Sequence, residues 1–285
     1  MKKIVGIGEV LWDLLPQGKQ PGGAPANFAY HVMQLGFDGY AVSAIGKDEL
    51  GSEIADFLQS KKVNALMEKV DYPTGIVEVH LDVAGVPTYN ICEDVAWDNI
   101  SLTPQMRELA QETDAVCFGT LAMRNPISRE CINQFIDLVP SASHKIFDIN
   151  LRQHYYSKEL IESSLNKCNI LKVNDDEIKI LMELLDIKSS DEKVYCKELM
   201  QKYNLELLIL TKGTEGSIIF SQDGSISEKP TPVVDVVDTI GAGDAFTAAF
   251  IVNIMKGHSV TEAHDSAIQV SAFVCSCKGA MPVYQ

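Results

Sequence analysis

The sequence predicts an α/β protein in which helices cover both faces of a mostly parallel sheet. Two kinds of segment alternate along the chain. One kind is short, apolar on both faces and rich in β-branched residues, as strands buried on two sides require; it comprises residues 3–10, 40–46, 115–120, 145–150, 169–174 and 206–213. The other kind is amphipathic with helical spacing; it comprises residues 26–35, 49–60, 126–139, 158–167, 175–185 and 192–203. Parallel strands need crossover connections, usually helices, so this alternation favours a sheet between two helical layers.

Three segments depart from this alternation. Residues 74–92 alternate between polar and apolar side chains around Gly85, which is typical of a hairpin with one apolar face. Residues 216–229 predict a second hairpin that turns at Asp223 and Gly224. Residues 242–277 are Ala-rich and read as helix, with a breaker at Gly257.

The chain has no internal repeat and no Pro- or Ser-rich linker, so we expect residues 1–285 to form a single domain. The apolar side of the 74–92 hairpin needs a partner, and no helix follows it directly. We therefore expect a small β lid, contributed mainly by residues 10–22 and 74–92, over the open edge of the main sheet. An exposed sheet of this kind can also pair with a second copy of the chain, so a homodimer through the lid is a further expectation.

Composition limits the possible partners. The chain carries a net charge of −15, which disfavours binding to a nucleic acid or an anionic membrane surface. No apolar run approaches the ~20 residues of a membrane-spanning helix, and the N-terminus lacks the pattern of a secretory signal, so we expect a cytoplasmic protein. The seven cysteines are scattered and odd in number, which favours reduced thiols over a disulfide framework.

The common nucleotide-binding motifs are missing. Gly6 and Gly8 follow the first strand, but Leu11 stands where the dinucleotide fingerprint needs a third glycine. The sequence contains neither a G-x-x-x-x-G-K-[ST] loop nor the protein-kinase motifs. It therefore disfavours a dinucleotide-dependent oxidoreductase and the phosphate-loop folds.

A glycine-rich turn before the Ala-rich helix is the strongest candidate for catalysis. In the segment DTIGAGDAF, residues 238–246, Gly241 and Gly243 leave the backbone N–H groups of the turn free to converge on an anion. The N-terminus of the following helix adds partial positive charge, and Asp244 lies in its first turn. A carboxylate there can accept a proton from a hydroxyl while the turn holds a phosphoryl group. The alternative is a simple turn in which Asp244 only stabilises the helix.

Three further segments carry polar residues near expected strand ends. GGAPANFA, residues 22–29, leads into a helix with Asn27 in its first turn, and Asp13 follows the first strand, where open α/β sheets bind ligands. NDDE, residues 174–177, places Asn174 and Glu177 on one face of a helix start. These two side chains either lie near a magnesium ion that they hold through water, or they form an ordinary capping box. TKGTEGS, residues 211–217, approaches phosphates or merely closes a hairpin.

In this order and spacing, the four motifs resemble the PfkB (ribokinase-like) family of carbohydrate kinases, and the resemblance runs from GIGEVLWD to KGAMP. It implies a three-layer α/β/α fold with a β lid. The site residues that the resemblance implies are Asp244 as catalytic base; Gly241, Ala242 and Gly243 as anion hole; Asp13, Gly22, Gly23, Asn27 and Arg152 at the substrate, Arg152 also at the transferred phosphate; Asn174, Thr211, Gly213 and Gly216 at ATP; Glu177 at Mg²⁺; and Asp235, with carbonyls around Gly279, at a monovalent cation such as K⁺.

GGAPAN and DINLR look most like the corresponding segments of fructokinases, and the Ala24–Pro25 pair lacks the lysine of many sugar-phosphate kinases. We therefore expect ATP-dependent phosphorylation of a free sugar, fructose in the first place. Ribose, 2-keto-3-deoxygluconate and a nucleoside are alternative substrates, and for an acid Arg124 or Arg152 would supply the extra cation. A sensor of sugar or nucleotide without catalysis is the alternative from another class.

Overall fold

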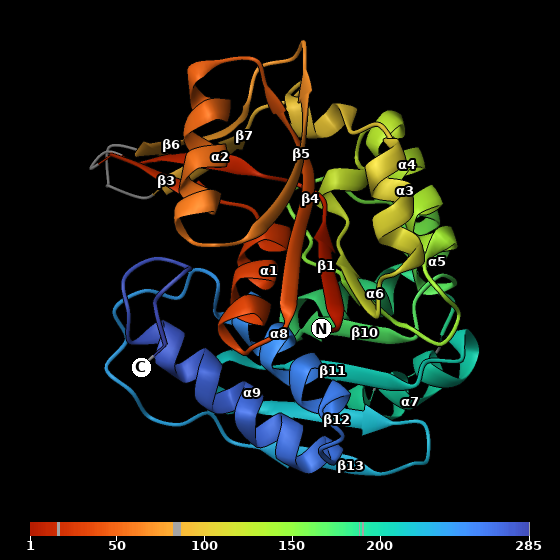
Figure 1. Cartoon of the computed structure of the whole chain (residues 1–285). Helices are drawn as coiled ribbons and strands as arrows, with labels where there is room; N and C mark the ends of the chain where they lie inside the picture. The colour runs from red at the N-terminus through yellow and green to blue at the C-terminus, as the bar shows by residue number, and fades with distance from the viewer. Residues whose placement is uncertain (16–17, 82–86, 188, 190, 285) are drawn as a thin grey trace.

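The computed structural model describes residues 1–15, 18–81, 87–187, 189 and 191–284, and these residues form two sheets (Figure 1). The large sheet has the strand order β13-β12-β11-β10-β9-β8-β1-β4-β5. Its strands are β1 (Lys3–Ile7), β4 (Asp38–Gly46), β5 (Asn64–Val70), β8 (Ala115–Phe118), β9 (His144–Asp148), β10 (Ile170–Asn174), β11 (Leu207–Thr211), β12 (Ser217–Ser221) and β13 (Ile226–Lys229). Every neighbouring pair is parallel except β11–β12 and β12–β13. The predicted α/β class is therefore confirmed.

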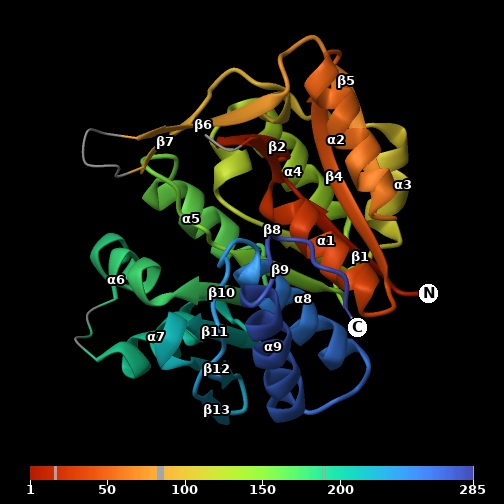
Figure 2. The same cartoon turned by 90° about the vertical axis from the view of Figure 1, so that its left-hand side faces the viewer.

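Helices lie on both faces of the large sheet (Figure 2). One face packs against α3 (Pro104–Gln111), α4 (Pro126–Leu138), α5 (Lys158–Leu165), α6 (Asp175–Leu184) and α7 (Glu192–Tyr203). The other packs against α1 (Ala24–Gln34), α2 (Glu49–Ser60), α8 (Ala242–Met255) and α9 (Val260–Cys275). Apolar side chains of β1 and β8–β11 enter clusters on both faces, which explains why most residues of these strands are apolar.

Short polar side chains begin most of these helices. Asp48, Thr103, Asn125, Ser157 and Asp191 each accept a hydrogen bond from a backbone N–H in the first turn of α2, α3, α4, α5 and α7. Such caps satisfy donors that the helix itself leaves unpaired. The helix starts therefore follow from local sequence.

The small sheet, which we call the lid, has the order β3-β2-β6-β7. It consists of β2 (Leu11–Leu15), β3 (Gly18–Gly22), β6 (Gly75–Leu81) and β7 (Pro87–Ile91). One face carries Trp12 and Leu14, which pack toward α2 through the cluster that includes Leu50. The predicted turn at Gly85 lies outside the described residues.

Two details differ from the sequence-based expectation. The structure adds α3, β5 and the short strand β3, which the apolar patterns alone do not indicate. The first apolar run ends as a strand at Ile7, and residues 11–15 continue as a strand of the lid. The expected breaker at Gly257 is present, since this residue adopts a φ of 87° and residues 242–277 form two helices, α8 and α9, on either side of it. Within the described residues, none of the helices has the length and apolar character needed to cross a membrane.

Candidate active site

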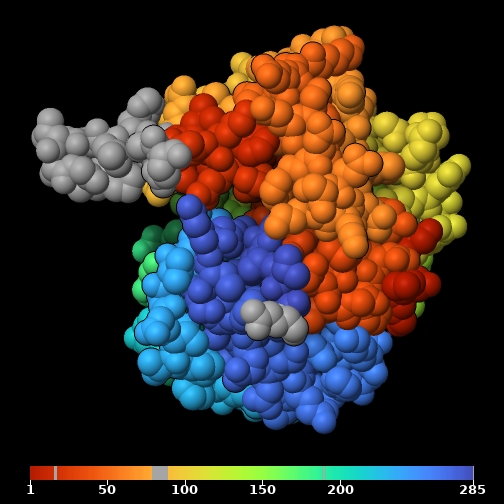
Figure 3. Space-filling view, turned by 60° about the vertical axis from the view of Figure 1, so that its left-hand side comes forward, coloured from red at the N-terminus to blue at the C-terminus, as the bar shows by residue number. Residues whose placement is uncertain are grey.

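A cavity of about 610 Å³ lies between the lid and the carboxyl ends of β1, β9, β10 and β11. Figure 3 shows the molecule hollowed between the lid strands, in red, and the C-terminal segments, in blue. The structure brings ten of the predicted site residues to its wall: Asp13, Gly22, Gly23, Asn27, Arg152, Asn174, Thr211, Gly241, Gly243 and Asp244. They come from segments up to 231 residues apart in the chain, so one concave site unites the four motifs.

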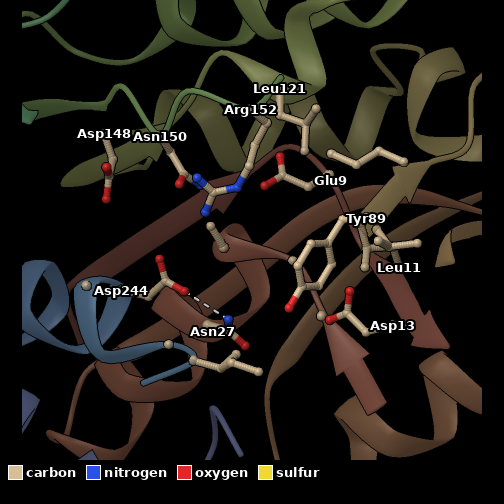
Figure 4. A pocket seen from close by; sticks show the side chains of 18 of the residues that line it. Glu9, Leu11, Asp13, Asn27, Tyr89, Leu121, Asp148, Asn150, Arg152 and Asp244 are labelled. Carbon is tan, nitrogen blue, oxygen red and sulfur yellow. Dashed lines mark hydrogen bonds between the residues drawn. The ribbon is translucent and has the colours of Figure 1, made fainter. Parts of the chain in front are cut away.

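The glycine-rich turn and α8 place Asp244 at the centre of this wall. Gly241 is the N-cap of α8 with a φ of 77°, and a Cβ there would lie 2.6 Å from the Cβ of Ala280. Glycine is therefore required at this position for both conformation and space. Asp244 follows in the first helical turn, and its Oδ2 accepts a hydrogen bond of 2.8 Å from Asn27 Nδ2 (Figure 4).

The surroundings of Asp244 bring its pKa to about 7. Loss of solvent raises the pKa most, and the neighbouring carboxylate of Asp148 raises it further. The hydrogen bond from Asn27 and the charge of Lys172 lower it in part. A carboxylate with this pKa can both take up and release a proton near neutral pH.

An ion pair stands beside the glycine-rich turn. Lys172 in β10 and Asp148 in β9 are register partners, and Lys172 Nζ lies 2.9 and 2.8 Å from the two carboxylate oxygens. The ammonium also lies 3.3 Å from where a Cβ on Gly243 would be. Burial lowers the pKa of Lys172, but the charges of Asp148 and Glu177 outweigh it, so the pKa is raised and the ammonium stays charged. A fixed cation therefore faces the turn that can hold a phosphoryl group.

The lid end of the cavity combines carboxylates with apolar walls. Burial raises the pKa of Asp13 on β2. A Cβ on residue 22 would lie only 2.7 Å from Asp13 Oδ2, so glycine at this position leaves room for the carboxylate. Glu9 is only 5% exposed, and burial raises its pKa to about 7 against the opposing charge of Arg152. In Figure 4 the Arg152 guanidinium points into the cavity beside Glu9, and the Tyr89 ring lies next to Asp13.

The opposite end lies at β10 and β11, where Asn174 and Thr211 are register partners. Asn174 Oδ1 accepts hydrogen bonds from the backbone N–H groups of Asp176 and Glu177. Glu177 Oε2 in turn accepts a hydrogen bond from the Asn174 N–H, while Oε1 accepts one from the Leu151 N–H. The capping box thus exists, and it ties this helix start to the loop that carries Arg152.

Several predicted residues lie away from the cavity wall. Glu177 is 5% exposed behind Asn174, and Ala242 is not among the residues that line the cavity. Gly213 is exposed and accepts from Thr231 Oγ1, whereas Gly216 packs against the Lys229 carbonyl of the hairpin. Asp235 is exposed on the segment before the glycine-rich turn.

Arg124 is not available as a substrate cation. Its guanidinium binds both carboxylate oxygens of Asp98 at 2.8 Å and lies outside the main cavity. The expectation that Arg124 could serve an acidic substrate is therefore wrong, because a buried acid already neutralises it.

Sequence reasoning missed Glu9, Asp148 and Lys172 as members of the site. Each is a charged residue within or directly after an apolar strand segment, in KIVGIGEV, KIFDIN and NILKVN. Charge in a buried strand is costly unless it is paired or functional. That rule is the signal by which they could have been found.

Comparisons with known proteins agree with this geometry. Residues 16–284 match the family described as pfkB family carbohydrate kinase. A sugar kinase of Pyrococcus horikoshii is 31% identical over 273 residues, covering 89% of this chain and 83% of its own. A fructokinase of Salmonella typhimurium is 27% identical, covering 91% and 87%, and an aminoimidazole riboside kinase of Salmonella typhimurium is 26% identical, covering 99% and 91%.

The fold comparison leads to the same group. The crystal structure of the Pyrococcus horikoshii sugar kinase in complex with ATP has a TM-score of 0.81 at 27% identity, with 98% of this chain and 94% of that chain covered. The ribokinase-like three-layer architecture is therefore confirmed.

Proposed function

Because this chain belongs to the pfkB family of carbohydrate kinases, and hence to the enzymes that phosphorylate a sugar with ATP, we propose that its substrate is a free sugar, fructose in the first place, and that Asp244 is the catalytic base. The observation that carries this proposal is the position of Asp244. It stands in the first turn of α8, hydrogen-bonded to Asn27, between the glycine-rich turn and the lid.

In the proposed reaction the sugar lies at the lid end of the cavity. Asp13 and Asn27 bind its hydroxyl groups, and the reacting hydroxyl faces Asp244, which accepts the proton as the hydroxyl attacks the terminal phosphorus of ATP. The backbone N–H groups of residues 241–243 hold the charge that builds up on the transferred phosphoryl group. Arg152 reaches the same group from the opposite wall.

We further propose that Asn174 and Thr211 bind ATP, with Gly213 and Gly216 shaping the hairpin beside it. Within the described part of the chain, no three His, Cys, Asp or Glu side chains lie close enough to hold a metal ion. We propose that Mg²⁺ is held mainly by the phosphates of ATP and by water, with Glu177 acting on it through water from behind Asn174, since Mg²⁺ retains several waters. When bound, Mg²⁺ would neutralise part of the phosphate charge. We also propose that a K⁺ ion binds near Asp235. We propose separately that two copies of the chain form a homodimer through the lid.

We propose that the lid closes over the sugar and excludes water that would otherwise hydrolyse ATP. Hydrogen exchange in the lid strands should slow when the sugar binds. Unchanged exchange would argue against closure.

The deciding experiment measures ADP release with Mg-ATP and fructose, ribose, tagatose, 2-keto-3-deoxygluconate or adenosine. Asp244→Asn should lower kcat by about 10²–10⁴, because a positioned general base contributes that factor. Asp56→Asn, an exposed change on α2, serves as the matched control. Retained turnover in Asp244→Asn would remove Asp244 from the role of base, and a lack of turnover with every acceptor would favour a sensor.

A second candidate substrate is a riboside. The lid end is lined by Leu11, Val77, Tyr89, Ile91 and Leu121, which is more apolar surface than a small polyol needs. A planar heterocycle would use that surface, while the ribose would take the place of the sugar at Asp13 and Asn27. A kcat/KM that is higher for adenosine than for fructose in the same panel would favour this candidate.

A further inference from the structure

The loop after β9 contains two residues in an unfavourable backbone conformation. Asn150 has a φ of 42° and Gln153 a φ of 48°, on either side of Arg152, and both residues line the cavity. Non-glycine residues persist in this region where the surrounding structure requires a side chain in one place. Gln153 is exposed, so packing into a core does not explain it.

Gln153 binds the outer edge of the lid. β7 is the last strand in the order β3-β2-β6-β7, so one of its edges has no neighbouring strand among the described residues. Gln153 Nε2 donates a hydrogen bond of 2.7 Å to the Tyr89 carbonyl oxygen in β7. The Tyr155 hydroxyl lies 3.3 Å from the Ile91 carbonyl oxygen. Carbonyls two residues apart point to the same side of a strand, so both contacts fall on this edge.

The two residues held in this way also form part of the cavity wall. Side chains two residues apart share one face of a strand, and the side chains of Tyr89 and Ile91 both line the cavity. The Tyr89 ring points toward Asp13 (Figure 4), although the residue is 54% exposed. Because more than half of Tyr89 is exposed, the position of its ring depends on its backbone, which is held by β6 on one side and by Gln153 on the other.

We infer that Gln153 is a positioning residue for the sugar: it fixes the edge strand of the lid through the Tyr89 carbonyl and so sets the Tyr89 ring against the sugar end. This inference rests on the proposed function as a sugar kinase. The same loop carries Arg152, so contact between Arg152 and the substrate and placement of the lid are linked through one short segment. Asn174 and Thr211, at the ATP end, take no part in this contact.

The sharpest test is Gln153→Gly, because glycine adopts a φ of 48° without strain and has no side-chain amide to donate a hydrogen bond. We expect the KM for the sugar to rise about 3- to 10-fold, as for the loss of one hydrogen bond, with the KM for ATP within twofold of wild type. Tm should not fall. Gln153→Ala should raise the KM for the sugar equally but lower Tm relative to Gln153→Gly, since alanine keeps the strain.

Gln105→Ala, an exposed change on α3, is the matched control and should leave both KM values unchanged. An unchanged KM for the sugar in Gln153→Gly would overturn the inference. Equal rises in the KM values for sugar and ATP, or a fall in Tm for Gln153→Gly, would show a merely structural role and overturn it too. If wild type turns over no acceptor in the panel, the proposed function fails and the inference with it, whereas an active wild type with an unaffected variant refutes the inference alone.

Discussion

Two ion pairs are buried in the described part of the chain, and they differ in what surrounds them. Arg124 and Asp98 are 6% and 2% exposed, and Lys172 and Asp148 are 10% and 9% exposed. Both pairs therefore give up most of their hydration. Burial and pairing alone would assign them the same role.

The first pair lies outside the cavity of about 610 Å³ and, apart from its border on smaller surface pockets, is closed in by protein. The Arg124 guanidinium lies between the rings of Trp97 and Tyr155, at 4.0 and 4.6 Å from their centroids. It also donates a hydrogen bond of 2.5 Å to the carbonyl oxygen of Cys92, directly after β7. A planar guanidinium suits such stacking and forked hydrogen bonding. This pair therefore anchors the base of the lid.

The second pair opens onto the cavity. Lys172 Nζ stands beside Gly243, and its charge lowers the pKa of Asp244, while Asp148 raises it. An ammonium carries three donors, so two can bind Asp148 while one faces a phosphoryl group. Burial and pairing are alike in the two pairs. What lies next to each pair, packed aromatic rings or the main cavity, is therefore the better indication of whether it serves stability or chemistry.

The largest expected effect comes from breaking the closed pair. Arg124→Met should lower the free energy of unfolding, measured by urea denaturation, by about 3–5 kcal/mol, because it leaves Asp98 buried without a partner. In the protein that remains folded, kcat should stay within about threefold of wild type. Arg107→Met, an exposed change on α3, should alter stability by less than about 0.5 kcal/mol. A hundredfold loss of kcat in folded Arg124→Met would place this residue in the chemistry and erase the contrast.

Breaking the open pair should act on the reaction. We expect Lys172→Met to lower kcat by about 10²–10³, the loss that follows removal of one preorganised charge-stabilising donor. Lys172→Met/Asp148→Asn removes the unpaired carboxylate and so should regain stability, while kcat stays low. Lys179→Met, an exposed change on α6, is the control. If the double variant recovered wild-type kcat, the pair would be structural after all.

The smallest effect is a pH dependence that the open pair sets. With a pKa of about 7, Asp244 should give a kcat/KM that falls about tenfold per pH unit below 7, measured from pH 5 to 9. Lys172→Met should move this acid limb to higher pH, because Lys172 lowers the pKa of Asp244. Glu9 titrates in the same range, so Glu9→Gln must keep the limb if Asp244 causes it.

The same pKa carries a stability prediction with a definite sign. In the folded chain the pKa of Asp244 lies above its value in the unfolded chain, so the folded state binds more protons between about pH 4 and 7. The contribution of Asp244 to stability therefore falls as the pH rises through this window. Above pH 7, Asp244→Asn should be more stable than wild type by about 1–3 kcal/mol. Lower stability of this variant at pH 8 would contradict the raised pKa.

Much of the fold was predictable because its signals are local. The alternation of apolar strands and amphipathic helices, with polar caps such as Asp48 and Ser157, indicated the parallel sheet and its two helical layers. The glycine-rich turn predicted Asp244 at a helix start, which is where the structure places it. The resemblance to the PfkB family, now confirmed, rested on the same short segments.

The rest depended on contacts between distant segments. β3 and β5 have weak apolar patterns, and they are strands because β2 and β4 provide edges for them. Lys172 and Asp148 stand out in sequence only as charges in apolar strands, and their pairing becomes visible when β9 and β10 pair in register. Arg124 looked available for substrate because nothing near it in sequence shows that Asp98 neutralises it.

By itself, then, the sequence determined the fold class, the family and the place of the glycine-rich turn, since each depends on residues within a few positions of one another. Only the tertiary structure decided which charges meet. It closed Arg124 into protein, opened Lys172 onto the cavity, and joined Gln153 to the lid edge 64 residues earlier. The physical reason is that hydrogen bonds and charge pairs act over a few ångströms, and chain folding alone sets those distances.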